Sequence, residues 1–361
     1  MARRLRVVHC GTAAVGHLAL RGILEHENLE LVGLLAASPE KIGLDVGEIL
    51  GIAPTRIIAT NDIDALVALK PDCFSYFAGA IGREDEAVDQ LSAFLCAGTN
   101  VVSTSMFSLI DPATSPEIDL VRKLEAACRE GGSSMFNSGI EPGFATVHLP
   151  ATLASLCSEV ELLRITEFFN YNSYPVKLII QDLFGFGLAK DQLPGLFNTE
   201  LPGSYDKMWG PSIHLLGRIL GREIDEIRLV TDFWLAEEPF DMRACHVPKD
   251  HIGGIRFEIQ GMVGGKPFII VEHVNYGSDH HPPHWERPVT GNGTYRVTIK
   301  GKPNIINSMS FGGEGDEPNV AGRIATAMHT INAIPGVCAA PAGILTIADL
   351  PLYASRSKAR P

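Results

Sequence analysis

The sequence predicts an α/β fold in which an N-terminal doubly wound parallel sheet is followed by an α+β domain with a largely antiparallel sheet. Over the first 145 residues, short apolar runs alternate with helical patterns, which is typical of parallel βαβ units. From about residue 146 the apolar runs become longer and richer in β-formers. The chain has 361 residues and is therefore long enough for two domains.

The first 145 residues divide into short strands and helices, with turn-forming pairs such as Gly131-Gly132 between them. The predicted strands are Leu5–His9, Leu29–Ala36, Cys73–Phe77, Asn100–Ser103 and Ser134–Asn137. The predicted helices are Val15–Glu25, Ile63–Leu69, Glu84–Ala97 and Ser115–Glu130.

The second domain is expected over residues 146–320, beginning with an apolar helix at Ala145–Leu156. Gly264-Gly265 is predicted to be a hairpin turn. The segment Asp182–Arg222 is rich in Gly, Pro and Phe, and we expect it to cover a pocket. The predicted strands are Val160–Phe169, Arg228–Trp234, Ile255–Val263, Pro267–Val274, Thr294–Lys300 and Ile305–Phe311. In the apolar segment 321–361, Ala321–Ile331 is a predicted helix with proline-containing turns after it, and the segment is expected to pack back on the first domain.

A glycine-bearing turn joins the first strand to the first helix in "RVVHCGTAAVGHLAL", residues 6–20. Its pattern is G-x-A-x-x-G, with Ala13 at the second glycine of the dinucleotide-binding fingerprint. One extra methyl group is tolerable if the pyrophosphate sits slightly further out, because the helix N-terminus still offers N–H groups and a positive dipole end. The alternative is a tight turn without a ligand. The predicted pyrophosphate contacts are Gly11, Thr12, Ala13, Ala14, Val15 and Gly16, and residues 1–145 are accordingly predicted to be an NAD(P)-binding Rossmann domain.

The end of the second strand favours NADP, with NAD still possible. The stretch "LLAASPEK", residues 34–41, has no carboxylate where an NAD site holds the ribose hydroxyls. Ser38 can donate to a 2′-phosphate and Lys41 can neutralise it; the alternative is that Lys41 is a solvated loop charge. For the nicotinamide half we predict contacts with Ala78, Gly79, Ser105 and Gly143.

Composition excludes several classes of protein. A formal net charge of -12 argues against sequence-independent nucleic-acid binding, and no apolar run is long enough to cross a bilayer. The seven cysteines are scattered without a C-x-x-C pair, and no signal peptide precedes the first strand, so we expect a cytoplasmic protein with reduced thiols.

The motifs resemble those of the dihydrodipicolinate-reductase-like superfamily, in particular the branch of native amine dehydrogenases and 2,4-diaminopentanoate dehydrogenase. The resemblance covers nearly the whole chain and rests on the segments 11–23, 38–41, 100–105, 138–144 and 326–344. It implies a Rossmann domain that binds NAD(P), an α+β domain with the substrate between the two, and a homodimer. The histidine-rich helix motif of true dihydrodipicolinate reductase is absent, so a role in lysine biosynthesis is not expected.

One position departs from this resemblance. In amine dehydrogenases of this type a glutamate soon after the "NVVSTS" strand binds and activates ammonia or amine, and the matching residue here is Met106. Glu141 in "SGIEPGF" is the predicted replacement, since a partly buried carboxylate there can exchange protons. The alternative is that Glu141 only complements the helix N-terminus, with Pro142 in the first turn of that helix.

Aromatic residues near the end of the first long strand suggest a pocket for an apolar substrate. Tyr171 and Tyr174 can orient or protonate a carbonyl oxygen, the alternative being ordinary packing. The predicted pocket wall consists of Met106, Phe168, Phe169, Met208 and Trp209. Asp279, His280, His281 and His284 are interspersed with prolines, which argues against a metal site, and none is predicted.

The function predicted from these features is NAD(P)H-dependent reduction of a C=O or C=N bond in a small, largely apolar substrate. The alternative is a catalytically inactive protein that senses NADP(H) or serves a partner. Met106 favours the alternative, whereas the aromatic pocket and the nucleotide turn favour the enzyme.

Overall fold

The computed structural model describes residues 3–193, 197, 204–278, 284–287, 293–312 and 317–356. The chain divides into two compact units: unit 1 comprises Met1–Phe144 and Arg323–Pro361, and unit 2 comprises Ala145–Gly322. The predicted boundaries at residues 145 and 320 lie one and two residues from these positions.

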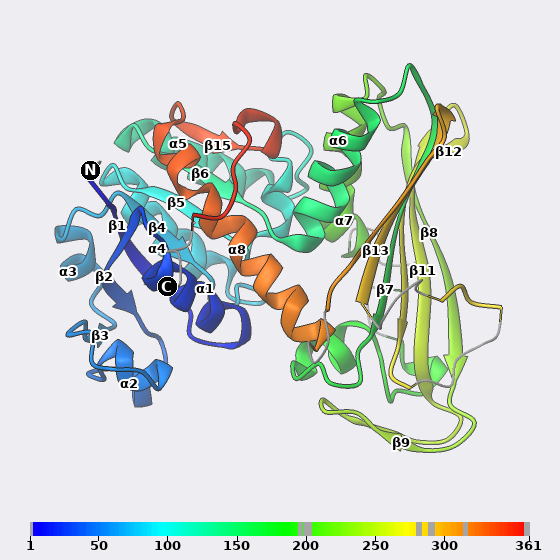
Figure 1. Ribbon diagram of the computed structural model, residues 1–361, viewed down its shortest axis with the longest axis horizontal. Coiled ribbons are helices and arrows are strands. Elements are labelled where there is room, and N and C mark those ends of the chain that lie inside the picture. Colours follow the sequence, from blue (N-terminus) through cyan, green and yellow to red (C-terminus); the bar gives the residue numbers. More distant parts are fainter. Residues whose placement is uncertain are drawn as a thin grey trace. The chain divides into compact units, whose positions relative to one another are not determined.

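Unit 1 contains a seven-stranded sheet in the order β15-β6-β5-β4-β1-β2-β3, in which every pair is parallel (Figure 1). Without β15, this is the strand order 3-2-1-4-5-6 of a Rossmann fold, which confirms the predicted doubly wound sheet. The strands are β1 (Leu5–Cys10), β2 (Leu29–Leu35), β3 (Ala59–Thr60), β4 (Cys73–Tyr76), β5 (Asn100–Ser103), β6 (Ser134–Asn137) and β15 (Gly343–Leu345).

Local signals begin and end the helices of unit 1. Asp62 accepts a hydrogen bond from the Ala65 N–H at 2.9 Å and begins α3, while Gly132, with φ +64°, ends α5. The helices are α1 (Ala14–Glu25), α2 (Val46–Leu50), α3 (Ile63–Ala68), α4 (Glu84–Cys96), α5 (Ile118–Gly131) and, from Arg323 onward, α8 (Pro318–Ala339).

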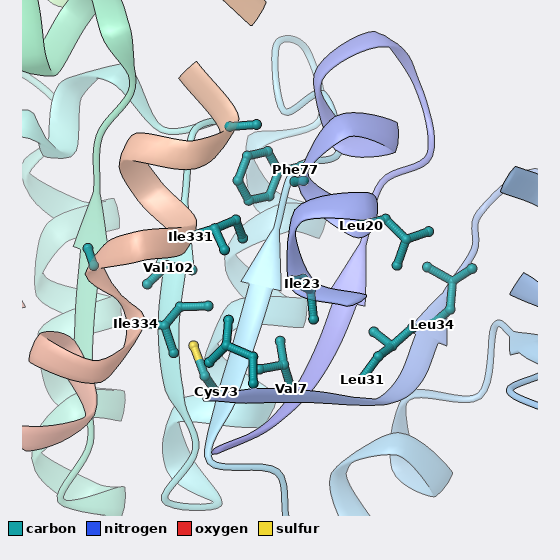
Figure 2. Close-up of a cluster of buried hydrophobic side chains, with 14 of the residues drawn as sticks. Val7, Leu20, Ile23, Leu31, Leu34, Cys73, Phe77, Val102, Ile331 and Ile334 are labelled. Carbon is teal, nitrogen blue, oxygen red and sulfur yellow. The ribbon is translucent and has the colours of Figure 1, made fainter. Parts of the chain in front are cut away.

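Two apolar clusters cover opposite faces of this sheet. Val7 and Val8 are consecutive in β1 and belong to different clusters, because successive strand residues face opposite ways. Figure 2 shows the cluster of Val7, in which Ile23 of α1 and Ile331 and Ile334 of α8 surround the strand. The cluster of Val8 involves α4 and α5 instead.

Helix α8 extends beyond its predicted end at Ile331 and contains Pro335. The prediction of proline-containing turns directly after Ile331 is therefore wrong. A proline removes one backbone hydrogen bond from a helix interior, but Ile334 and Val337 on either side of Pro335 are fully buried in the cluster of Figure 2. Packing thus maintains the helix across the proline.

Unit 2 contains a six-stranded sheet in the order β14-β13-β7-β12-β11-β8, in which only β7 and β12 pair in parallel. Gly264 and Gly265, with φ +58° and +77°, form the predicted hairpin turn between β11 and β12. The strands are β7 (Glu159–Asn170), β8 (Glu226–Leu235), β11 (Ile252–Val263), β12 (Lys266–Tyr276), β13 (Gly293–Lys302) and β14 (Ile305–Ser310), with β9 (Phe240–Asp241) and β10 (His246–Val247) forming a separate pair.

Two helices, α6 (Leu149–Ala154) and α7 (Ser204–Ile219), lie over one face of this sheet (Figure 1). Helix α7 contacts β11 and β12, and α6 contacts β7 and β13. Helix α7 is not among the predicted helices, because Gly210 and Pro211 interrupt the helical pattern. It lies within Asp182–Arg222 and brings Trp209 to Phe257 of β11 and His273 of β12.

Candidate active site

The turn between β1 and α1 has the geometry that the fingerprint requires at its first and third glycines. Gly11 has a φ of +106°, and a Cβ there would lie 2.6 Å from the Phe77 carbonyl group. A Cβ on Gly16 would lie 2.4 Å from the Gly11 carbonyl oxygen. Ala13, the substituted position, is exposed and occupies the N-cap of α1, where its side chain makes no capping hydrogen bond to the first helical N–H groups. The turn is therefore tight and closely packed, as the first and third glycines of the fingerprint require.

The side chain of His9, in strand β1, hydrogen-bonds to this turn. His9 was not among the predicted site residues. Its ring is fully buried, with Nε2 2.7 Å from the Gly11 carbonyl oxygen and 3.0 Å from that of Gly16. Because carbonyl oxygens only accept, Nε2 carries the proton and Nδ1, at 3.1 Å, accepts from the Ser75 hydroxyl. Burial lowers the pKa of His9 to about 4, although the backbone hydrogen bonds oppose this shift. A histidine in an apolar strand directly before the glycine turn is the signal that could have identified it.

The loop after β2 reaches the same turn. Lys41 Nζ donates a hydrogen bond to Thr12 Oγ1 at 2.7 Å, which joins two of the predicted cofactor residues. Ser38 is the residue before the short 3-10 turn Pro39–Lys41. Lys41 is thus not a freely solvated loop charge.

Helix α1 contributes a second cation, Arg21, and a histidine, His17, near Lys41. Arg21 Nε donates to His17 Nε2 at 3.2 Å. Partial burial and the positive charges of Arg21 and Lys41 lower the pKa of His17. The edge of α1 next to the nucleotide turn is therefore electropositive, although the chain as a whole carries a formal net charge of -12.

Other predicted cofactor contacts follow the carboxyl ends of neighbouring strands. Ala78 and Gly79 follow β4, and Ser105 follows β5, where its N–H donates to Ser103 Oγ at 3.0 Å. Because β4 pairs in parallel with both β1 and β5, these segments share one edge of the sheet with the glycine turn. Gly79 is exposed there, and Ala78 and Ser105 are half-buried.

Met106, by contrast, points into the core of unit 1. Its side chain is only 3% exposed and belongs to the apolar cluster that includes Leu109 and Leu124. Its backbone N–H donates to Asn137 Oδ1 at 3.1 Å. Met106, where the resemblance implies a glutamate, therefore fills a core position, and its contact with a substrate stays a prediction.

The segment that follows β6 makes a sharp turn. Gly143 has a φ of +139°, and a Cβ there would lie 2.4 Å from Ser138 Oγ. Glu141, Pro142 and Gly143 are all non-helical, and the Glu141–Pro142 peptide is cis. The expectation that Pro142 begins a helix is wrong, because the turn at Gly143 precedes the helical residues. Both carboxylate oxygens of Glu141 are buried.

Unit 2 contains a buried polar cluster centred on Glu167, a residue of β7 that is 3% exposed. Its Oε1 accepts hydrogen bonds from the Tyr171 hydroxyl at 2.8 Å and the Asn275 side-chain amide at 2.9 Å, and lies 3.2 Å from His273 Nδ1. Its Oε2 accepts from the Tyr295 hydroxyl at 2.7 Å. Burial alone would raise the pKa of the Glu167 carboxyl, but His273 and the hydrogen bonds from His273, Tyr295 and Tyr171 lower it to about 2. Glu167 is therefore a carboxylate at neutral pH.

Aromatic rings surround this cluster. The His273 ring stacks on Phe257 with centroids 4.4 Å apart and meets the Trp209 ring at 5.1 Å. Tyr171 contacts Tyr174 at 5.4 Å and Phe169 at 6.0 Å. The structure thus brings together Tyr171, Tyr174, Phe169 and Trp209, as the sequence predicts, and adds Glu167 and His273, which the sequence analysis did not select.

Phe168 is separated from this group. It precedes Phe169 in β7 and faces the other side of the sheet, where it packs with Val274 and Trp285 and lies 5.0 Å beneath the Arg296 guanidinium. Consecutive strand residues point to opposite faces, so Phe168 and Phe169 do not line one pocket wall.

Among the described residues, no group of three His, Cys, Asp or Glu side chains has an arrangement suited to a metal ion. His284 lies 3.5 Å from Asp232, while Asp279, His280 and His281 lie outside the described residues. In the part of the chain that the structure describes, no helix is long and apolar enough to span a membrane.

A Rossmann sheet with a glycine turn after its first strand, joined to an α+β unit with a largely antiparallel sheet, defines a two-unit nucleotide-binding protein of the dehydrogenase type. Residues 148–359 match the family described as the 2,4-diaminopentanoate dehydrogenase C-terminal domain. The chain is 32% identical to an amine dehydrogenase from Streptomyces virginiae over 350 residues, and these residues cover 95% of each chain. The chain belongs to this family of oxidoreductases, which confirms the resemblance that its motifs carry.

Two further relatives agree with this assignment. A 2,4-diaminopentanoate dehydrogenase from Acetoanaerobium sticklandii is 23% identical over 367 residues, or 97% of this chain and 94% of that one. The structure of an amine dehydrogenase from Mycobacterium smegmatis shares the fold with a TM-score of 0.75 and 22% identity, over 98% of this chain and 97% of that one.

Proposed function

We propose that this protein is an NAD(P)H-dependent oxidoreductase that reduces a C=O or C=N bond of a small, largely apolar substrate. The observation that carries the proposal is the glycine turn at the carboxyl edge of the Rossmann sheet. A Cβ at Gly11 or Gly16 would collide with the protein's own backbone, so both glycines keep the turn tight and closely packed, which supports pyrophosphate binding at the N-terminus of α1. Bound nicotinamide would supply the hydride.

NADP is the proposed cofactor, with NAD also possible. Lys41, hydrogen-bonded to Thr12 of the turn, is a cation within reach of the nucleotide site, and Arg21 adds to the electropositive edge. Ser38 adds a hydroxyl donor in the same loop. A 2′-phosphate would gain charge-assisted hydrogen bonds from such a set, whereas no carboxylate in residues 34–39 is present to hold free ribose hydroxyls.

Handling of the substrate's proton is proposed for Glu141, Tyr171 or Tyr174. Glu141 is the carboxylate proposed to replace the glutamate of the relatives, since Met106 can neither ionise nor hold an ammonium. In unit 2, the Tyr171 hydroxyl donates to Glu167, so it is held in a fixed orientation. If Glu141 acts on ammonia or amine, turnover will require ammonium.

The apolar character of the substrate is proposed from the side chains around the Glu167 cluster. Phe169 and Trp209 are almost fully buried there and Met208 is half-buried on α7. Apolar walls with a few fixed polar groups are typical of small-molecule sites.

A spectrophotometric screen tests the proposed function. The purified protein would be mixed with NADPH or NADH and with cyclic and medium-chain ketones or aldehydes, with and without ammonium. Turnover only with ammonium would indicate an amine dehydrogenase, and turnover without it a carbonyl reductase.

A second candidate function is an inactive NADP(H) sensor. The specific observation that favours it is the core position of Met106, where the resemblance implies a glutamate. In the same screen, cofactor binding without consumption of cofactor by any carbonyl would support the sensor over the enzyme.

A further inference from the structure

The Glu167 cluster is more polar than the fold of unit 2 requires. On the same face of the sheet, Ile165 in β7 and Val271 in β12 are apolar and almost fully buried. Glu167 and His273, each two residues further along these strands, are opposite one another in the register. Burying a carboxylate has a desolvation penalty, and a protein with apolar side chains at such sites is often as stable or more stable. A pair retained in an otherwise apolar layer is therefore a candidate for chemistry.

The pair fixes the orientation of the imidazole. Nδ1 of His273 faces the Glu167 carboxylate at 3.2 Å, and the ring stacks on Phe257 and meets the Trp209 ring edge to face. Glu167 is itself held by Tyr171, Asn275 and Tyr295. With the carboxylate on Nδ1, Nε2 is the nitrogen through which the ring can exchange a proton with another molecule.

Two buried polar atoms beside the pair have no hydrogen-bond partner among the described residues. They are Nε1 of Trp209, a residue 2% exposed, and Oδ1 of Asn275, a residue 0% exposed. The first is a donor only and the second an acceptor only. An unpartnered buried polar atom is destabilising, and the usual explanation in a native protein is an unseen partner.

Together, these two atoms suit a ligand whose polar end carries an oxygen acceptor, an N–H donor or both. A carbonyl oxygen can accept from Trp209 Nε1–H, and a neighbouring N–H of an amine, imine or amide can donate to Asn275 Oδ1. The rings of Phe257 and Trp209 offer apolar surface for the rest of a small molecule.

We propose that His273, oriented by Glu167, exchanges a proton with the polar end of the substrate, which Trp209 and Asn275 hold. This rests on the proposed function. In carbonyl reduction, the carbonyl carbon receives the hydride, the C=O π pair moves to oxygen, and an O–H bond forms as the Nε2–H bond of an imidazolium breaks. The N–H electron pair stays on His273, and Glu167 remains a carboxylate and acts as a positioning residue.

The first test compares wild type with His273→Gln, Glu167→Gln and Trp209→Phe, and with His284→Gln as a matched control, since the His284 side chain is 72% exposed. Loss of a general acid typically lowers kcat by about 100-fold or more, so His273→Gln should do this and also remove the solvent deuterium isotope effect on kcat. The Kd for NADPH should stay within about twofold, because the nucleotide turn belongs to unit 1. Trp209→Phe should raise KM for the carbonyl by roughly tenfold, as expected for one lost hydrogen bond. Glu167→Gln should shift the pH profile of kcat, which a purely structural role would leave in place.

If wild type turns over and His273→Gln keeps kcat within threefold, the inference is wrong while the proposed function stands. If wild type turns over no carbonyl, the proposed function is wrong, and a second measurement decides the inference. In the protein without cofactor, a non-reactive amide such as cyclohexanecarboxamide should shift the ¹⁵N signal of His273 and bind at least about tenfold more weakly to Trp209→Phe. An unshifted signal at high amide concentration would overturn the inference.

Discussion

Replacing His9 with glutamine should change how the stability of unit 1 depends on pH. Glutamine can still donate to the Gly11 and Gly16 carbonyl oxygens and accept from Ser75, but it does not titrate. In the native protein the pKa of His9 is lowered from 6.5 to about 4 by burial. Below pH 6.5 the unfolded chain therefore takes up a proton that the native chain excludes until about pH 4.

The sign and magnitude follow from this difference. The stability that neutral His9 provides is complete above pH 6.5 and is lost as the pH falls towards 4. The shift from 6.5 to about 4 corresponds to about 3 kcal/mol, at about 1.4 kcal/mol per unit. Other histidines whose pKa is lowered, such as His17 and His26, are present in both proteins and cancel in the comparison.

The assay is urea unfolding of wild type and His9→Gln at pH 7 and at pH 4. The sequence has three tryptophans, Trp209, Trp234 and Trp285, and all lie in unit 2, so their fluorescence follows that unit. Far-UV circular dichroism detects the helices of unit 1, and the exposed His284→Gln serves as the control. Between the two pH values, wild type should lose about 3 kcal/mol relative to His9→Gln. A free-energy difference that is the same at both pH values would refute the assignment of His9 as a buried neutral donor.

Three other predictions concern the cofactor, the acid and the assembly. Lys41→Ala should raise KM for NADPH by about 10- to 100-fold, through loss of charge-assisted hydrogen bonds, and leave KM for NADH within about twofold. Equal effects on both KM values would contradict the 2′-phosphate role of Lys41, and Lys123→Ala serves as the control. Glu141→Gln should lower ammonium-dependent kcat by about 100-fold or more, and unchanged turnover would remove Glu141 from the mechanism. Light scattering after gel filtration should give twice the chain mass of 39.0 kDa, as the proposed homodimer requires, whereas a mass of one chain would exclude it.

Much of unit 1 was predictable because its signals are local. Strand–helix alternation and the spacing of Gly11 and Gly16 indicate a parallel sheet with a nucleotide turn, and both glycines have the close contacts that their spacing implies. The long strands of unit 2 were also predictable from their β-rich composition. Phe168 and Phe169 were assigned to one wall although the period of a strand places neighbours on opposite faces.

The features that the sequence did not reveal depend on packing and register. Helix α7 contains Gly210 and Pro211, and α8 continues through Pro335, because burial against a sheet outweighs local propensity. His273 meets Glu167 only through the register of β12 on β7, across 106 positions of sequence. Neither residue belongs to a short motif, so nothing in the sequence connects them.

We propose above that this protein transfers hydride from a nicotinamide cofactor to a carbonyl or imine carbon. The most direct measurement of this transfer follows NADPH absorbance after addition of cyclohexanone and other small apolar carbonyl compounds, with and without ammonium, alongside chromatography of the products. We predict that NADPH is consumed in equal amount to the alcohol or amine formed. Tight binding of NADPH with no consumption by any of these compounds would contradict the claim and favour the sensor.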